Sequence, residues 1–156
     1  MRVGILCDYF LAESDEEAAW TIDRGPNTAE VRDGWLLRGL EPVTPVSVPG
    51  LEPVDMLASL EFLMTGQAVG SVLVVDSSSG GGRRAERWVF RVSREVHVAL
   101  ADADDASLGD VAVSWSATAE MRRGSVEVLT GVLVRLAELA RCGRETETDM
   151  YCWMSL

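Results

Sequence analysis

The sequence predicts a single α+β domain over residues 1–156, with a small mixed or antiparallel sheet packed by a long C-terminal helix and two to four shorter helices. Two observations lead to this fold class. The strand-like segments cluster without the regular strand–helix alternation that is typical of parallel sheets. In addition, residues 125–156 are the most apolar unit of the chain and predict a long helix followed by a buried strand.

The C-terminal helix is predicted over residues 125–141, because apolar residues recur there at spacings of three and four. Ser125 can cap its N-terminus, and Gly143 fits the position after its C-terminus. Residues 144–149 then form a solvated connection to a strand over residues 151–156. In that strand Tyr151, Trp153 and Ser155 alternate with Cys152, Met154 and Leu156.

The N-terminal third is predicted to begin with a central strand over residues 2–10 that is covered on both faces. Ser14 to Glu17 matches the S-x-x-E capping box of a helix that runs to about Arg24. The proline-rich segment 28–54 is predicted to wrap the domain irregularly. Residues 35–37 and 46–48 are its candidates for short or edge strands.

The middle of the chain predicts a helix followed by a hairpin. Pro53 fits the first position of an apolar helix that ends at Gly66. Residues 71–75 and 87–93 have strand character and could pair over the loop at residues 76–82.

Two further helices are predicted before the C-terminal one, and residues 118–121 are a candidate for an additional turn of helix. Ser93 caps a helix that runs through about Ala103. Ser107 to Asp110 offers a second and weaker capping box for a short helix that leads to Trp115.

Composition excludes several function classes. A chain of 156 residues, 47% of them hydrophobic, can bury a core without disulfides. The net charge of −11 argues against nucleic acids and anionic membrane surfaces, because both are bound through Lys and Arg. It suits a soluble protein or a protein that binds a basic partner.

The cysteines indicate a reducing compartment. Cys7, Cys142 and Cys152 are odd in number and include no C-x-x-C pair, so no disulfide framework is expected. The apolar run at residues 3–7 is too short for a secretion signal, and no stretch has the length of a membrane helix. We therefore expect a cytoplasmic protein without a membrane partner.

The sequence contains no recognisable catalytic or metal-binding constellation. His97 is the only histidine and is predicted mid-helix with one nitrogen toward solvent, where it lacks a positioned partner. One His and three scattered Cys lack metal-ligand spacing. Residues 80–84 lack the Lys and the Ser or Thr of a phosphate-binding loop. We expect neither a cofactor nor a metal, and we rank a non-enzymatic role above an enzymatic one.

The aromatic residues supply the candidate binding site. Most of the five tryptophans are expected in the core, although two or three could line a groove that anchors a partner. The candidate site is a groove where the ends of the N- and C-terminal strands meet, because pockets form at such places. Its residues are Asp8, Tyr9, Trp115, Tyr151 and Trp153.

Three segments, in order, resemble the YfbM-like family of uncharacterised bacterial proteins. They are Asp8-Tyr9-Phe10 followed by Ser14 to Glu17, the apolar helix ending Leu63-Met64-Thr65-Gly66, and residues 94–108 followed by the long helix and a terminal strand. The second segment lacks the tryptophan usual in the family. The ending Tyr151-Cys152-Trp153 is also similar to uncharacterised actinobacterial proteins of this size. The resemblance implies a small α+β domain and transfers no catalytic residue.

Three functional hypotheses follow. The first is a non-enzymatic domain that binds another protein, such as an immunity-type inhibitor whose acidic face covers a basic toxin domain. The second is a small-molecule-binding or hydrolase-like protein with a pocket at the five candidate residues. The third, compatible with either, is a homodimer that hides excess apolar surface.

Overall fold

The fold is built on one five-stranded sheet in which each neighbouring pair of strands is antiparallel. The computed structural model describes residues 4–67, 72–78, 86–121 and 124–156. The strand order is β2-β1-β5-β4-β3, so the C-terminal strand lies at the centre. The strands are β1 (Leu6–Ala12), β2 (Val46–Ser47), β3 (Val72–Ser78), β4 (Arg87–Val92) and β5 (Asp149–Ser155).

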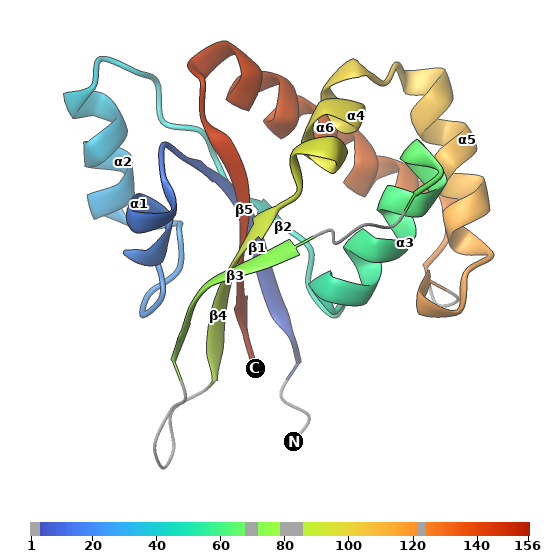
Figure 1. The fold of residues 1–156 in the computed structure, drawn as a ribbon, viewed down its shortest axis with the longest axis horizontal. Coiled ribbons are helices and arrows are strands. Elements are labelled where there is room, and N and C mark those ends of the chain that lie inside the picture. The colour runs from blue at the N-terminus through green and yellow to red at the C-terminus, as the bar shows by residue number, and fades with distance from the viewer. Residues whose placement is uncertain (1–3, 68–71, 79–85, 122–123) are drawn as a thin grey trace.

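Helices cover both faces of the sheet, which is seen nearly edge-on in Figure 1. The four later helices form a layer on one side, and the two N-terminal helices lie on the other side. The first group is α3 (Pro53–Thr65), α4 (Arg94–Asp102), α5 (Asp105–Ser116) and α6 (Val126–Thr146), with a 3₁₀ turn at Ala119–Met121. The second group is α1 (Asp15–Ala19) and α2 (Ala29–Leu37). The predicted α+β class, with a long C-terminal helix packed on the sheet, is confirmed.

The main core lies between the sheet and the layer of four helices. Alternate strand residues point into it, as the period of two requires. The helix α6 contributes the predicted apolar stripe, in which Leu129, Leu133, Leu136 and Ala140 are almost fully buried. The strands contribute Cys7, Tyr9 and Leu11 from β1, Phe90 and Val92 from β4, and Met150, Cys152 and Met154 from β5.

A smaller core occupies the opposite face of the sheet, beneath α1. It contains Phe10, Ala12, Ala18, Val89, Tyr151 and Trp153. The Trp153 indole donates a hydrogen bond to the Ile22 carbonyl at 3.1 Å, and a Cβ on Gly25 would lie 3.4 Å from its ring. Gly25 has φ +80°, a conformation that glycine adopts without strain. Because this core covers the second face of β5, residues 150–155 are all buried.

Several predicted helix ends are confirmed. The side chains of Ser14, Ser93 and Ser125 each accept a hydrogen bond from the amide three residues later, at 3.1–3.2 Å. Each serine thereby satisfies one amide that has no partner within its helix. Pro53 is the first residue of α3, and Gly66 ends that helix with φ +77°. The predicted hairpin partners form β3 and β4, but β3 continues through Ser78, so residues 76–78 of the predicted loop at 76–82 belong to the strand. The rest of that loop and the predicted strand start at residues 2–3 lie outside the described residues.

Three predictions in the first half and middle of the chain are wrong. Trp35 to Leu37 belong to α2, which Thr28 caps by accepting from the Val31 amide, and are not a strand. The helix after Ser14 ends at Ala19 instead of Arg24, because a series of turns leads to Gly25. The helix α5 begins earlier than predicted, since Asp104 rather than Ser107 is its cap.

The C-terminal helix is longer than predicted. It continues to Thr146, and the turn is made by Glu147 with φ 55° instead of Gly143. Gly143 is a helix residue with a packing role: a Cβ there would lie 3.0 Å from the His97 ring and 3.0 Å from Leu11 Cδ2. The absence of a side chain therefore lets α4 and β1 approach the last turns of α6.

The two glycines inside α6 give a matched test of this packing. Gly143→Ala should lower the free energy of unfolding by about 1–3 kcal/mol, because the new methyl group overpacks a buried contact. Gly131 is exposed, and no described atom beyond its chain neighbours and the backbone of its own helix lies within 4 Å of its Cβ position. Gly131→Ala should therefore raise stability by about 0.5–1 kcal/mol through helix propensity. Urea unfolding of both variants measures this, and equal effects would contradict the packing role of Gly143.

Candidate functional site

The five predicted site residues lie on both sides of the sheet. Tyr9 and Trp115 are fully buried in the main core, between the sheet and the layer of helices α3 to α6. The Trp115 indole donates to Ser59 Oγ at 3.0 Å, and the Tyr9 hydroxyl contacts Met56 Sδ at 3.9 Å. Both polar groups therefore have partners inside the core.

Tyr151 and Trp153 lie in the smaller core on the other face. Asp8 pairs in register with Trp153, and its carboxylate accepts a hydrogen bond from Ser47 Oγ at 2.5 Å. The sheet thus separates Tyr9 and Trp115 from the other three residues. The predicted groove formed by all five is wrong, and α1 with its following turn, rather than the proline-rich segment, covers Tyr151 and Trp153.

Burial changes the acidity of both tyrosines. It raises the pKa of Tyr9 well above its usual range, because the ionised form would have to exist in the apolar core. The pKa of Tyr151 is also raised, first by burial and then by the hydrogen bond that its hydroxyl donates to Asp15 Oδ1 at 2.8 Å. Both hydroxyls therefore stay protonated in the folded protein.

This protonation predicts a loss of stability at alkaline pH. A group whose pKa is raised by folding stabilises the fold fully below its unfolded pKa, about 10 for tyrosine, and less as the pH rises above it. Tyr9 and Tyr151 are the only tyrosines. Tyrosinate absorbance should therefore appear only together with the loss of near-ultraviolet circular dichroism. Gradual ionisation of one tyrosine in a protein that keeps its native spectrum would show that this side chain is accessible.

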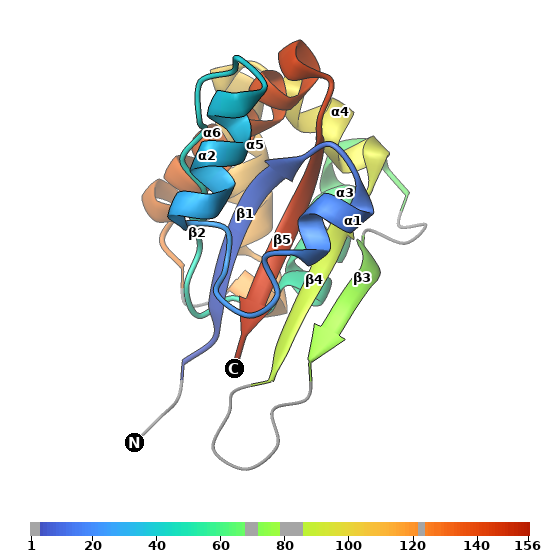
Figure 2. The ribbon, with the colours of Figure 1, turned by 90° about the vertical axis from the view of Figure 1, so that its left-hand side faces the viewer.

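A different site, the α1–α2 groove, is lined by residues of α1 and α2, the two helices that lie toward the viewer in Figure 2. It encloses about 290 Å³ and is open to solvent. The last residues of β1 form its floor, and α1, α2 and the turn between them form its walls. Its lining residues are Phe10, Leu11, Ala12, Glu17, Trp20, Thr21, Asp23, Arg24, Gly25, Thr28, Glu30, Val31 and Gly34.

Large apolar side chains stand exposed at this groove. Trp20 directly follows α1, lines the groove and is 76% exposed, whereas Trp35, Trp115 and Trp153 are buried and Trp88 is half-buried. On α2, Glu30, Gly34 and Leu37 follow one another at helical spacing, so Leu37 extends the stripe that lines the groove. Leu37 is 89% exposed. Both walls thus offer apolar surface to a partner.

The region around the groove is acidic. Carboxylates from Glu17, Asp23 and Glu30 line it, and Arg24 pairs with Glu30 at 3.4 Å. Over residues 13–38 acids outnumber arginines; the acids are Glu13, Asp15, Glu16, Glu17, Asp23, Glu30 and Asp33, against Arg24, Arg32 and Arg38. The groove therefore combines apolar anchors with excess negative charge.

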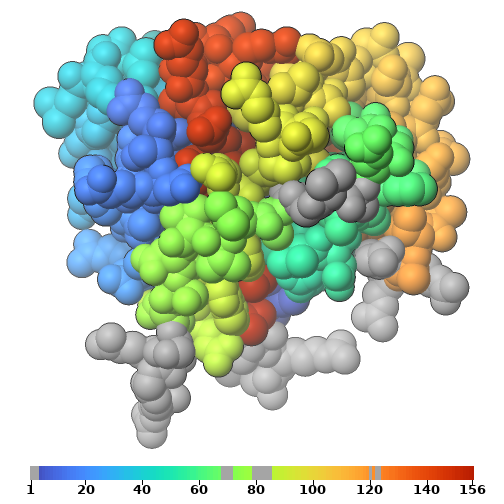
Figure 3. Space-filling view, in the orientation of Figure 1, coloured from blue at the N-terminus to red at the C-terminus, as the bar shows by residue number. Residues whose placement is uncertain are grey.

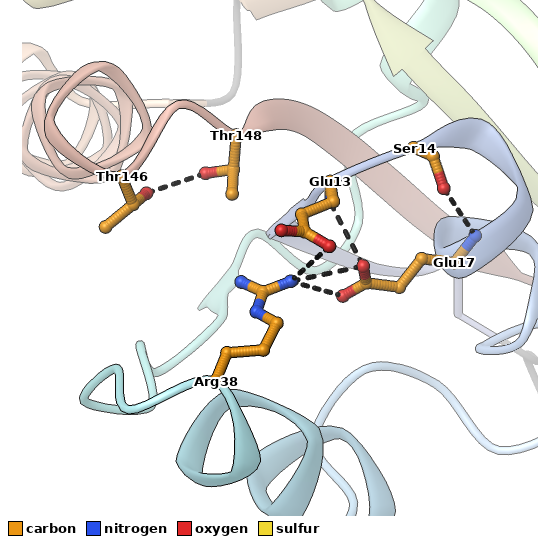
Figure 4. Close-up of polar contacts among 6 residues, drawn as sticks. All are labelled: Glu13, Ser14, Glu17, Arg38, Thr146 and Thr148. Atoms are coloured by element: carbon orange, nitrogen blue, oxygen red, sulfur yellow. Dashed lines mark hydrogen bonds and ion pairs between the residues drawn. The ribbon is translucent and has the colours of Figure 1, made fainter.

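Arg38 fixes α2 relative to α1 (Figure 4). Its Nη1 lies 3.2 Å from Glu13 Oε2 and 3.2 Å from Glu17 Oε2, while its guanidinium lies over the Trp35 ring at 4.8 Å. Glu17 also accepts from the Glu13 amide at 3.3 Å and lies at the capped end of α1. The spacing of the two groove walls therefore depends on this ion-pair cluster.

The Nε and Nη2 of Arg38 are buried without a partner among the described residues. Figure 4 shows the hydroxyls of Thr146 and Thr148 on the side of Nη2. Thr146 donates to the Cys142 carbonyl, so the Thr148 hydroxyl is the donor in their mutual bond of 2.9 Å. The carboxylates of Glu13 and Glu17 carry more negative charge than the single positive charge of the guanidinium. The Nε and Nη2 edge of Arg38 therefore suits ordered water better than an anion.

Removing the cluster should loosen α2 specifically. Arg38→Met is expected to cost about 1–2 kcal/mol of stability, between the values of exposed and fully buried pairs, because Arg38 is only 23% exposed. Hydrogen exchange over residues 29–37 should become faster. Arg24→Met removes an ion pair between two highly exposed side chains and should change stability by less than about 0.5 kcal/mol. Similar exchange rates over residues 29–37 in both variants would contradict the role of Arg38 in holding α2.

The remaining reactive side chains have structural environments. His97 Nε2 donates to the Ala140 carbonyl at 2.9 Å, because a carbonyl oxygen can only accept. All three cysteines are free, Cys7 and Cys152 are buried, and burial raises the pKa of the Cys142 and Cys152 thiols. Within the described ranges there is no group of three residues suited to a metal, and no helix is long and apolar enough to cross a bilayer.

Comparisons with protein-family models, curated proteins and solved structures give no match for this chain. The YfbM-like resemblance therefore stays a prediction. The candidate site is therefore identified from the structure alone. It is the α1–α2 groove with the exposed Trp20.

Proposed function

We propose that this protein is a non-enzymatic binding module that docks a basic protein partner on the α1–α2 groove. The observation that carries the proposal is Trp20, a tryptophan 76% exposed on the wall of an acidic groove. An isolated folded domain gains no stability from placing one of its five tryptophan side chains in water. Burial of that side chain under a partner contributes favourable free energy to binding.

Trp20 has the properties of an interface anchor. Tryptophan is enriched among the few residues that supply most of the binding energy of protein interfaces. Its indole offers a large, rigid apolar area and one hydrogen-bond donor. Val31 lines the opposite wall on α2, and the exposed Leu37 extends that wall, so a side chain inserted between α1 and α2 would contact apolar surface on both sides.

The charge distribution selects the class of partner. Glu17, Asp23 and Glu30 line the groove, and the whole chain has a net charge of −11. Complementary potentials accelerate association and exclude acidic partners. A basic domain, such as a toxin that an immunity-type protein inhibits, fits these requirements. The three unpaired thiols suit action in a reducing compartment such as the cytoplasm.

Substitution of the anchor tests the proposal once a partner has been captured from host extract at low salt and purified. Trp20→Ala should weaken binding by at least about thirtyfold, the effect of losing about 2 kcal/mol at a hot spot. Phe62→Ala is the matched control, because Phe62 is a 59% exposed aromatic side chain on α3. Titration calorimetry measures both. Equal loss in the two variants, or failure to capture any protein, would contradict the proposal.

Salt dependence tests the electrostatic part separately. The association rate should fall as ionic strength rises, since exposed charges are screened within about 8–10 Å at physiological salt. Glu30→Gln should reduce this dependence without the large loss of affinity that Trp20→Ala causes. Stopped-flow measurements give both rates. Association that is independent of salt would exclude a basic partner for this face.

A further inference from the structure

The two edges of the sheet differ in their protection. At one edge β2 is only two residues long and lies between Pro45 and Pro49. At the other edge β3 has seven residues and, among the described strands, pairs only with β4. Short strands and prolines protect a sheet edge from added strands, whereas a long unpaired edge is a template for one. The β3 edge therefore has the features of an acceptor.

The surface of β3 is apolar and accessible. Leu73 is 53% exposed and Val74 56% exposed, and Asp76 is the only charged residue of the strand. In Figure 2 β3 is the outermost strand, and in Figure 3 its atoms lie on the surface that faces the viewer. The register shifts between Val74 and Asp76, so the ladder with β4 is regular over residues 72–74 and again over residues 76–78.

An open cleft adjoins the first residues of β3. It encloses about 610 Å³, and Val72, Leu73, Arg94 and His97 are among its lining residues. A strand that pairs antiparallel to β3 would run toward Val72 and end at this cleft. Arg94 is exposed and has no ion-pair or hydrogen-bond partner in the part of the chain that the structure describes. A cation without a partner at that point matches the carboxylate that ends a polypeptide.

We propose that β3 and the adjoining cleft bind the C-terminal end of another polypeptide, as an added antiparallel strand whose terminal carboxylate pairs with Arg94. Main-chain hydrogen bonds to β3 supply affinity that depends little on sequence, and Leu73 and Val74 contact alternate side chains of the added strand. Asp149 and Glu95 also line the cleft and oppose the carboxylate, which lowers the affinity. This surface is separate from the α1–α2 groove and does not depend on it.

The probe is an N-terminally labelled seven-residue peptide of alternating Thr and Val, matched in length to β3, with a free C-terminal carboxylate. Fluorescence anisotropy should show binding at concentrations below about 1 mM. The same peptide with a C-terminal amide should bind at least about tenfold more weakly, because it lacks the charge-assisted hydrogen bond to Arg94. Arg94→Gln should cause the same loss for the free acid and no loss for the amide.

Two variants separate this site from general charge effects. Arg144→Gln is the control, because Arg144 pairs with Asp102 at 2.6 Å and lines a neighbouring cavity instead. It should leave the affinity unchanged. Asp149→Asn should tighten binding of the free acid only. Equal binding of acid and amide, equal effects of the two arginine substitutions, or no binding below about 1 mM would overturn the proposal. A protein dimer that protects the β3 amides and excludes the peptide would do so as well.

Discussion

Burial of β5 from both faces is the constraint on which the fold depends. This strand lies between β1 and β4, and its alternating side chains need cover on two sides. The helices α3 to α6 cover Cys152 and Met154, while α1 covers Tyr151 and Trp153. A one-residue slip of β5 would exchange these sets of side chains, so pairing with both neighbours fixes a single register.

The functional surface is a consequence of how the second face is covered. The turn that ends at Gly25 packs on the Trp153 ring, and the Ile22 carbonyl holds its indole. These contacts fix the segment that follows α1 and leave Trp20 pointing away from the core. Arg38 then sets the position of α2 through Glu13 and Glu17. The α1–α2 groove is therefore supported by the same packing that stabilises the central strand.

Sequence periodicity predicted the elements that bury a regular stripe, such as α6 and β4. It also predicted caps where Ser stands three residues before the amide that donates to its hydroxyl. It failed for α2, because Trp35, Leu36 and Leu37 are consecutive and only Trp35 is buried. The prediction of a groove lined by all five candidate residues was wrong for a related reason. Alternation already places Asp8 and Tyr9 on opposite faces of a strand, so they could not line one groove. Trp20 could have been found from its position off the stripe formed by Ala18 and Ile22, but its exposure depends on turns that the pattern does not specify.

The central claim is that the face of α1 and α2, and not the larger helical layer, is the docking surface for a protein partner. Hydrogen exchange of this chain with and without its partner tests it most directly. Protection should appear over residues 17–34 and extend to the end of α2, while the exposed faces of α3 and α5 exchange as in the free protein. Protection confined to α3, α4 or α5, with unchanged exchange around Trp20, would contradict the account.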